Sequence, residues 1–225
     1  MKSFLALCLS VVALSAVNPA SSMKMAFSDE FDGGVLDATK WASLNDSGAV
    51  TMFKADKVGC VRISMVKNGD KSQTNGITTR GKFEQVRGYF EASMRMNAFK
   101  GQGGSMYLHG NDAKVLPSIT LFWSTEGGDY LSPWAQLIDA KGQRDIRSDA
   151  SGTKLLRAGE ASKKFNTYGF LWAEKSFAWY LNGKQVHKAD RVAIATPMSL
   201  TVSRFNLNPV QVPDALDIDW VKVWK

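Results

Sequence analysis

Carboxylates that could act together in acid–base chemistry occur in a glycine-rich segment at the middle of the chain. Glu126 and Asp129 flank a Gly-Gly pair, and Asp139 follows on a predicted strand over 135–140. Two carboxylates that approach each other can divide the work of hydrolysis, one as nucleophile or base and the other as acid. A pair such as Glu126 and Asp139 could in principle meet. We favour the alternative, a solvated turn with ordinary surface acids.

Other side chains with catalytic chemistry are few, because the 225-residue chain has two His and two Cys. This count nearly excludes a zinc site built from several His and Cys ligands. His109 and His187 each end a predicted strand, where a surface role is more common than membership of a Ser–His–Asp triad. Cys60 lies in the apolar pattern G-C-V-R-I, which is typical of a buried small hydrophobic residue.

The chain begins with the pattern of a secretory signal peptide. Lys2 supplies a positive charge, 4–17 is a short apolar run, and small residues follow. Such a run is too short for a membrane span. We expect a signal peptide over residues 1–22, cleaved between positions 15 and 22, and one domain over residues 23–225 that is secreted or periplasmic. Cys8 leaves with the signal, so the mature chain cannot form an internal disulfide.

The net charge of +7 is distributed along the chain. A mildly basic exported protein could meet an acidic polysaccharide, nucleic acid or anionic lipid. The sequence has no run of five or more Lys and Arg and no helix with a basic stripe. We therefore interpret most of this charge as a solvated surface and expect no nucleic-acid partner and no membrane span.

Hydrophobic and polar residues alternate with a period of two in most of the chain after residue 22, for example over 89–96 and 216–224. This alternation predicts half-buried strands, and Gly- and Asn-containing turns separate them. Asn182-Gly183 predicts a type I′ hairpin over 177–186, because both residues tolerate positive φ. The segment 154–164 could form a short helix. The fold class predicted for residues 23–225 is therefore all-β, as one antiparallel sandwich.

Several segments, in order, resemble conserved segments of glycoside hydrolase family 16, the lichenases, laminarinases and their relatives. They are F-S-D-E-F-D-G at 27–33, R-G-Y-F-E-A-S-M-R-M at 87–96, K-G at 100–101, F-N-T-Y-G-F-L-W at 165–172, W-Y-L-N-G-K at 179–184 and D-I-D-W-V-K-V at 217–223. The resemblance implies a jelly-roll sandwich of the concanavalin A-like lectin/glucanase type. Two curved antiparallel sheets would form it, with a polysaccharide cleft for β-glucan or exopolysaccharide on the concave face.

The family is composed of retaining hydrolases, which need two carboxylates about 5–5.5 Å apart. It places them on one strand as E-x-D-x-E, or as E-x-D-x-x-E with a bulge. The strand that matches here is 117–124. Ser118 stands at the nucleophile position, Thr120 at the Asp position, and Phe122, or Trp123 if the strand is bulged, at the acid/base position. None carries a carboxylate, so the resemblance implies a scaffold without the double-displacement mechanism, a pseudoenzyme.

The resemblance also indicates candidate ligand-binding residues. Phe205 and Asn206 match a strand whose aromatic and amide side chains touch sugar in the family, and Arg204 adds a donor for a uronate or sulfate. Further aromatic candidates for a sugar platform are Phe122, Tyr107 and Trp134. Gly103 stands where the family often has a Trp. For each aromatic the alternative is core packing, and we assign Trp172, Trp179 and Trp220 to the core.

No cofactor is expected to be required, but the resemblance implies a structural Ca²⁺ on the convex face. Asp219 would be its side-chain ligand, with backbone carbonyls near Phe27 or Gly59. Oxygen ligands of this kind suit Ca²⁺. The alternative is a surface Asp in an alternating strand.

Three functions remain open at this point. We favour a secreted, non-catalytic carbohydrate-binding protein on a family 16 scaffold. The second is a family 16 hydrolase that cleaves O-glycosyl bonds in β-glucan or exopolysaccharide with relocated acids. The third is a structural or partner-binding protein of the envelope or matrix.

Overall fold

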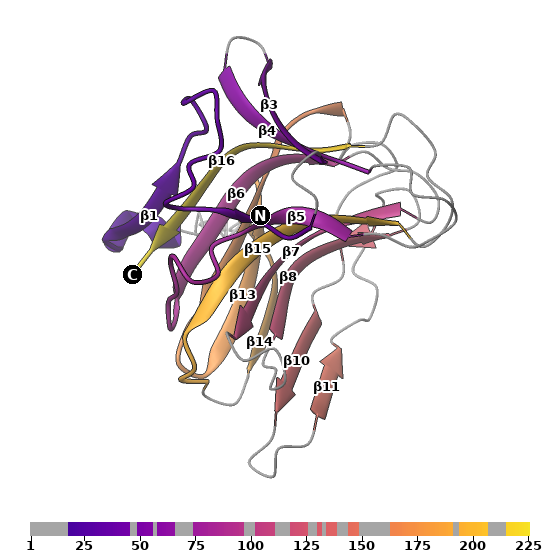
Figure 1. Ribbon diagram of the computed structural model, residues 1–225. Coiled ribbons are helices and arrows are strands. Elements are labelled where there is room, and N and C mark those ends of the chain that lie inside the picture. The colour runs from indigo at the N-terminus through magenta and orange to yellow at the C-terminus, as the bar shows by residue number, and fades with distance from the viewer. Residues whose placement is uncertain are drawn as a thin grey trace, which may run out of the picture.

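Most of the described residues lie in strands, as the alternating sequence pattern predicts. The computed structural model shows two antiparallel β-sheets packed face to face (Figure 1). The structure describes residues 18–45, 49–55, 58–65, 74–96, 102–110, 118–125, 130–131, 134–138, 144–148, 163–190, 194–206 and 215–225. The predicted all-β sandwich is confirmed, and the possible helix over 154–164 lies almost entirely outside the described residues.

The first sheet, called sheet A, has the strand order β14-β13-β12-β6-β16-β4-β3, with β1 paired to β16. Its strands are β1 (Met25–Asp29), β3 (Val50–Ala55), β4 (Val58–Ser64), β6 (Gly88–Met96), β12 (Asn166–Trp172), β13 (Ser176–Leu181), β14 (Lys184–Asp190) and β16 (Ala215–Trp224). Because β1 pairs with β16, the first and last strands lie side by side.

The second sheet, called sheet B, has the order β11-β10-β8-β7-β15-β5-β2, with β9 paired to β8. Its strands are β2 (Ala42–Ser43), β5 (Thr74–Thr78), β7 (Gln102–Gly110), β8 (Ser118–Thr125), β9 (Tyr130–Leu131), β10 (Trp134–Ile138), β11 (Arg144–Ser148) and β15 (Met198–Asn206). Strand β6, between β5 and β7 in sequence, belongs to sheet A, so the chain crosses from one sheet to the other and back.

The hydrophobic core lies between the two sheets. On β15, Leu200 and Val202 are fully buried in this core. Successive side chains of a strand point to opposite faces, so Thr201 and Ser203 lie on the other face of sheet B. The same alternation gives every central strand one apolar face and one face available for other chemistry.

The predicted hairpin is confirmed. Strands β13 and β14 pair around Asn182 and Gly183, whose φ angles are 50° and 76°. Both angles are positive, as a type I′ turn requires, and its twist matches that of the flanking strands.

Two of the three tryptophans assigned to the core lie there. Trp172 and Trp179 are each 1% exposed. Trp220 is half-buried on the outer face of sheet A instead, with the Lys222 ammonium 4.6 Å from its ring centroid. The register of β16 shifts between Ile218 and Trp220, and this bulge moves the indole to the outer face.

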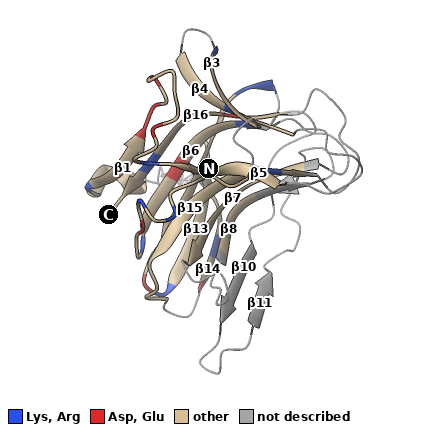
Figure 2. Cartoon of the chain, in the orientation of Figure 1, with Lys and Arg blue, Asp and Glu red and all other residues tan. Residues whose placement is uncertain are grey.

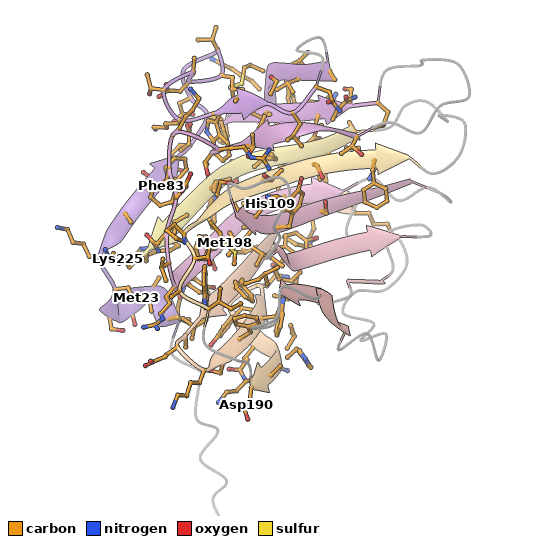
Figure 3. All side chains as sticks on the ribbon, turned by 60° about the horizontal axis from the view of Figure 1, so that its bottom comes forward. Met23, Phe83, His109, Asp190, Met198 and Lys225 are labelled. Carbon is orange, nitrogen blue, oxygen red and sulfur yellow. The ribbon has the colours of Figure 1, made fainter. Side chains whose placement is uncertain are left out.

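The described chain starts with a short 3₁₀ helix, η1 (Pro19–Ser22), that packs on the outside of sheet A. Ala20 and Met23 contact a satellite cluster of buried residues that includes Tyr89 and Tyr180. Met23 and Lys225 lie close together in Figure 3, and Lys24 and Lys225 exchange two backbone hydrogen bonds. Removal of residues up to 22 with a signal peptide would therefore remove contacts of the folded domain. No helix among the described residues is long and apolar enough to span a membrane.

Candidate functional site

Strand β8, which matches the family's catalytic strand, contains a bulge that decides which of its residues face the core. Met106 of β7 pairs with Phe122, whereas the next residue, Tyr107, pairs with Thr120. Leu121 is therefore the extra residue of β8. A shift of one residue moves side chains to the opposite face of a sheet.

Phe122 is a core residue, and the prediction that it faces a ligand is wrong. Its side chain is 1% exposed, and its ring centroid lies 5.0 Å from that of Tyr168 in an edge-to-face contact. The sequence allowed both registers of β8. The structure selects the bulged one, in which Trp123 rather than Phe122 occupies the acid/base position.

The three positions of the bulged motif are Ser118, Thr120 and Trp123, and none has an acidic side chain. Their backbone partners on β7 are His109, Tyr107 and Ser105, respectively. These β7 residues alternate with core residues and so lie on the face of sheet B turned away from the core. The double-displacement chemistry therefore has no carboxylate at its expected strand positions.

That face, which we call the hydroxyl face, is lined with short polar side chains. Its described members are Thr78 of β5, Ser105, Tyr107 and His109 of β7, and Ser199, Thr201, Ser203 and Phe205 of β15. The hydroxyl oxygens of Ser105 and Ser203 are 2.8 Å apart. Those of Thr78 and Thr201 are also 2.8 Å apart. Thr78, Thr201 and Ser203 are at most 5% exposed, so these pairs join neighbouring strands, and Ser105, Tyr107, His109 and Phe205 are the more accessible side chains of the face.

Tyr107 lies in the middle of β7, between Thr201 of β15 and Thr120 of β8, and its role in ligand binding stays a prediction. It is half-buried, and its phenol shares a hydrogen bond with the Thr201 side chain. Burial raises the pKa of Tyr107, so the phenol stays neutral and can both donate and accept. Its ring meets that of His109 edge to face, with centroids 6.5 Å apart.

Arg204 does not reach this face, and its predicted role as a donor to a uronate or sulfate is wrong. It is fully buried. Leu200 and Val202 point into the core, and Arg204 follows them with the same period of two. That period was visible in the sequence and could have corrected the prediction.

The remaining binding candidates occupy strand positions near the hydroxyl face. Phe205 is half-buried, and its backbone pairs with Gly103 and Thr74. Trp134 of β10 pairs with Thr120, and Asn206 pairs with Gln102. The side chains of Asn206 and Trp134 lie outside the described residues, as do those of Ser118, Thr120 and Trp123, so their binding roles stay predictions.

Sheet B is poor in acids. The only acidic residue within its strands is Asp145, on the edge strand β11. The strands of sheet A contain five: Asp29, Glu91, Asp190, Asp217 and Asp219. In Figure 2, acidic residues colour β1 and β6 of sheet A, whereas β7 of sheet B has neither acidic nor basic colour. The candidate relocated acids Glu126, Asp129 and Asp139 lie outside the described residues.

Asp219, the candidate Ca²⁺ ligand, lies at the bulge of β16. Burial is the main cause that raises the pKa of Asp219, and nearby Glu30 and Asp32 raise it further. The Ser93 hydroxyl donates to Asp219 at 3.1 Å. A β-carbon at Gly59 would lie 2.3 Å from the Phe31 carbonyl oxygen, so β4 and the chain start touch here.

A hard cation near Asp219 would bring an opposite charge to this cluster of carboxylates. Within the described residues, no three His, Cys, Asp or Glu side chains are arranged to hold a metal. A Ca²⁺ at Asp219 would therefore need oxygen ligands other than a third side chain of these types, such as backbone carbonyls.

Comparisons with known proteins support the scaffold. Residues 38–222 match the family model of glycosyl hydrolases family 16. A beta-glucanase of Brevibacillus brevis is 28% identical over 142 residues, 56% of this chain and 53% of the relative. A beta-glucanase of Fibrobacter succinogenes is 27% identical over 158 residues, 63% of this chain and 44% of the relative. The chain thus spans about half the length of the curated relatives it matches.

Solved structures share the fold over most of the chain. An endo-beta-1,3-glucanase from Pyrococcus furiosus has a TM-score of 0.71 at 13% identity, covering 90% of this chain and 94% of that one. The laminarinase catalytic domain from Thermotoga maritima has a TM-score of 0.68 at 18% identity, covering 90% of this chain and 98% of that one. The kappa-carrageenase from Pseudoalteromonas carrageenovora has a TM-score of 0.70 at 16% identity, covering 90% of this chain and 95% of that one. The predicted jelly-roll sandwich is confirmed.

Proposed function

The chain belongs to glycosyl hydrolase family 16, and from this premise we propose that it binds a polysaccharide without hydrolysing it. The observation that carries the proposal is the bulged strand β8. It has Ser118, Thr120 and Trp123 where the resemblance places the nucleophile, its Asp partner and the acid/base. Retention requires two carboxylates, and neither hydroxyls nor an indole can replace them.

Binding would use the hydroxyl face. Sugar sites combine aromatic surfaces, which stack on the C–H groups of a pyranose, with a few polar groups that pair with its hydroxyls. Tyr107 offers a half-buried phenol, and Phe205 offers an aromatic ring at the end of β15. The half-buried Ser105 and Tyr107 hydroxyls offer donors and acceptors, whereas Thr78 and Thr201 are 5% and 1% exposed and support Tyr107 from below. We expect affinity to come from stacking and hydrogen bonds.

A second candidate function, hydrolysis with relocated acids, is favoured by the relatives that are named beta-glucanases. Its acids would be Glu126 and Asp139. The two functions are separated by a reducing-sugar assay on lichenan and laminarin, run beside affinity electrophoresis on the same glycans. We expect binding with no hydrolysis above buffer, because loss of the nucleophile and acid/base lowers turnover by several orders of magnitude.

The matched controls for that assay are Glu126→Gln and Asp139→Asn. Turnover in the native chain that either substitution abolishes would overturn the non-catalytic proposal and assign the acids. If the protein neither binds nor hydrolyses any of these glycans, that result favours the structural or partner-binding function instead.

We also propose that the protein is exported with a signal peptide cleaved before Asn18. The support is the contact of Ala20 and Met23 with the cluster on sheet A, which cleavage after Ser22 would partly remove. Intact mass of the exported protein tests this, and a first residue beyond Asn18 would contradict it.

Finally, we propose Asp219 as a side-chain ligand of a structural Ca²⁺, supported by the carboxylates around it and by the close approach of Gly59 to Phe31. Its role would be to join the chain start to β4 and β16. It has no part in binding at the hydroxyl face, which is on the other sheet.

A further inference from the structure

A positive charge lies beside the hydroxyl face where the resemblance places negative ones. The Arg80 guanidinium Nη2 is 3.2 Å from Nδ1 of His109. His109 (Figure 3) is the residue of β7 that pairs with Ser118, the position of the nucleophile in the resemblance. Sequence reasoning missed this pair, because Arg80 and His109 are 29 residues apart and belong to elements that are not neighbours in the chain.

The turn that carries Arg80 is held firmly against sheet B. The Thr78 hydroxyl accepts from the Arg80 backbone N–H at 3.3 Å. The Thr79 hydroxyl donates to the Phe83 carbonyl at 2.8 Å and accepts from the Leu200 N–H at 2.9 Å. The backbone of Arg80 is therefore fixed at the edge of the hydroxyl face, while its side chain is exposed.

The charge of the Arg80–His109 pair belongs to Arg80. Burial is the main cause that lowers the pKa of His109, the hydrogen bond to the Gly110 carbonyl opposes the shift, and the Arg80 charge lowers it further, so the imidazole is neutral at neutral pH. No acidic side chain in the described part of the chain forms an ion pair with Arg80. Nδ1 of His109 also lies 2.5 Å from the Gly110 carbonyl oxygen, to which it donates, so the Arg80 guanidinium packs against the imidazole and keeps its five N–H donors for other partners.

Among the hydroxyls near this guanidinium, that of the half-buried Tyr107 is open to a ligand, because Thr78 and Thr201 are only 5% and 1% exposed. Thr78, whose hydroxyl accepts from the Arg80 backbone, is paired with Thr201, and Thr201 contacts Tyr107. Tyr107 lies next to the Arg80–His109 pair, because its ring contacts that of His109 with centroids 6.5 Å apart. A bidentate guanidinium beside neutral hydroxyls is a common arrangement for recognition of carboxylate and sulfate oxyanions.

We propose that Arg80, packed against His109, forms a subsite for an oxyanion on an acidic glycan, with the half-buried Tyr107 phenol beside it. The inference rests on the proposed polysaccharide binding and specifies its ligand as a glycan that bears carboxylate or sulfate groups.

Two pairs of glycans test the subsite, each with one charged and one neutral member. Polygalacturonate is compared with its methyl ester, and dextran sulfate with dextran, by calorimetry at 0.15 M salt. We expect at least about tenfold tighter binding of the charged member in one pair, which also tells carboxylate from sulfate. Arg80→Gln should abolish that preference.

The matched control is Lys82→Gln, which removes one positive charge from the same exposed turn. It should change affinity for the charged glycan by less than about twofold. Equal losses in Arg80→Gln and Lys82→Gln would show general attraction of polyanions and overturn the subsite. If Arg80→Gln melts early, Arg80→Lys replaces it, and it should weaken the preference because an ammonium lacks the planar fork. An undiminished preference in that variant would also overturn the subsite.

Failure of the subsite is distinct from failure of the proposed function. Equal binding of charged and neutral glycans would leave polysaccharide binding intact and remove the subsite. Binding to none of the four glycans, together with none to lichenan and laminarin, would remove both.

Discussion

The outer face of sheet A keeps its carboxylates and gives them partners, whereas the hydroxyl face of sheet B has no acidic side chain among its described residues. Asp217, 4% exposed at its side chain, accepts from Arg62 and Arg95, each at 2.7 Å. Glu91 accepts from the buried Tyr89 phenol at 2.8 Å. A buried charge that loses its partner is strongly destabilising, so such acids are difficult to replace singly.

The strand positions of sheet B that match the family's catalytic positions carry no charged side chain. Acids crowded on one strand face repel each other and serve chemistry rather than stability. Ser118 and Thr120 are neutral and need no counter-ion, and the backbone pairing of β8 with β7 and β10 is retained. The comparison teaches that the fold does not require acids at the catalytic positions, because β8 keeps its strand pairing without them.

The largest expected effect is the difference between substitutions on the two faces of sheet B. Phe122→Ala empties a fully packed core position and should destabilise by about 3–5 kcal/mol. Phe205→Ala should leave the melting temperature nearly unchanged and weaken glycan binding by about 1–3 kcal/mol. Chemical denaturation and calorimetry on both variants check this. A Phe122→Ala protein that melts normally but does not bind would show that the bulge register is wrong.

Asp217→Ala should cause the next largest loss in the free energy of unfolding. It leaves Arg62 and Arg95 without their shared carboxylate, and we expect a loss of about 2–3 kcal/mol. This is below the value for a fully buried pair, because the Arg62 and Arg95 side chains are 40% and 28% exposed. Glu174→Ala is the control, since its exposed pair with Arg87 at 3.7 Å should contribute almost nothing. Equal losses in the two variants would contradict the distinction between partnered and surface acids.

Calcium should stabilise the sheet A side of the molecule. At a Ca²⁺ concentration ten times the dissociation constant, linkage gives about 1.4 kcal/mol. Thermal melts with Ca²⁺ and with chelator measure it, and Asp219→Asn should remove the difference. A difference that persists in Asp219→Asn would place the metal elsewhere, and no difference in the native chain would exclude a Ca²⁺ site that stabilises the fold.

The smallest effect is a pH dependence from Glu91. Burial raises the pKa of Glu91 above its ordinary value of 4.5, although the Tyr89 hydrogen bond and Lys222 oppose the shift. The folded state therefore takes up the proton first as pH falls, and stability decreases as pH rises from about 4.5 through the folded-state pKa. Glu91→Gln should flatten this slope.

This slope is measured in the Asp219→Asn background, because burial raises the pKa of that carboxyl as well. Glu174→Gln is the exposed control and should leave the slope unchanged. An identical slope with and without Glu91 would mean that its carboxyl titrates alike in the folded and unfolded chains.

Much of the fold could be predicted because strand periodicity is local. Asn182-Gly183 alone specifies a hairpin turn. The site was less predictable, because faces depend on register. Two bulges, one in β8 and one in β16, reversed the faces assigned to Phe122 and Trp220. A bulge is set by pairing with the neighbouring strand, which a pattern within one strand does not reveal.

The sequence by itself determined the all-β sandwich, the family resemblance and the absence of carboxylates from the strand that should carry them. It did so because residue types and a period of two are properties of single segments. Only the tertiary structure decided that Arg204 is buried while Arg80 meets His109 beside Ser118. Arg80 and His109 meet because β15 pairs with both β5 and β7. Such long-range pairing brings together side chains that no local pattern connects.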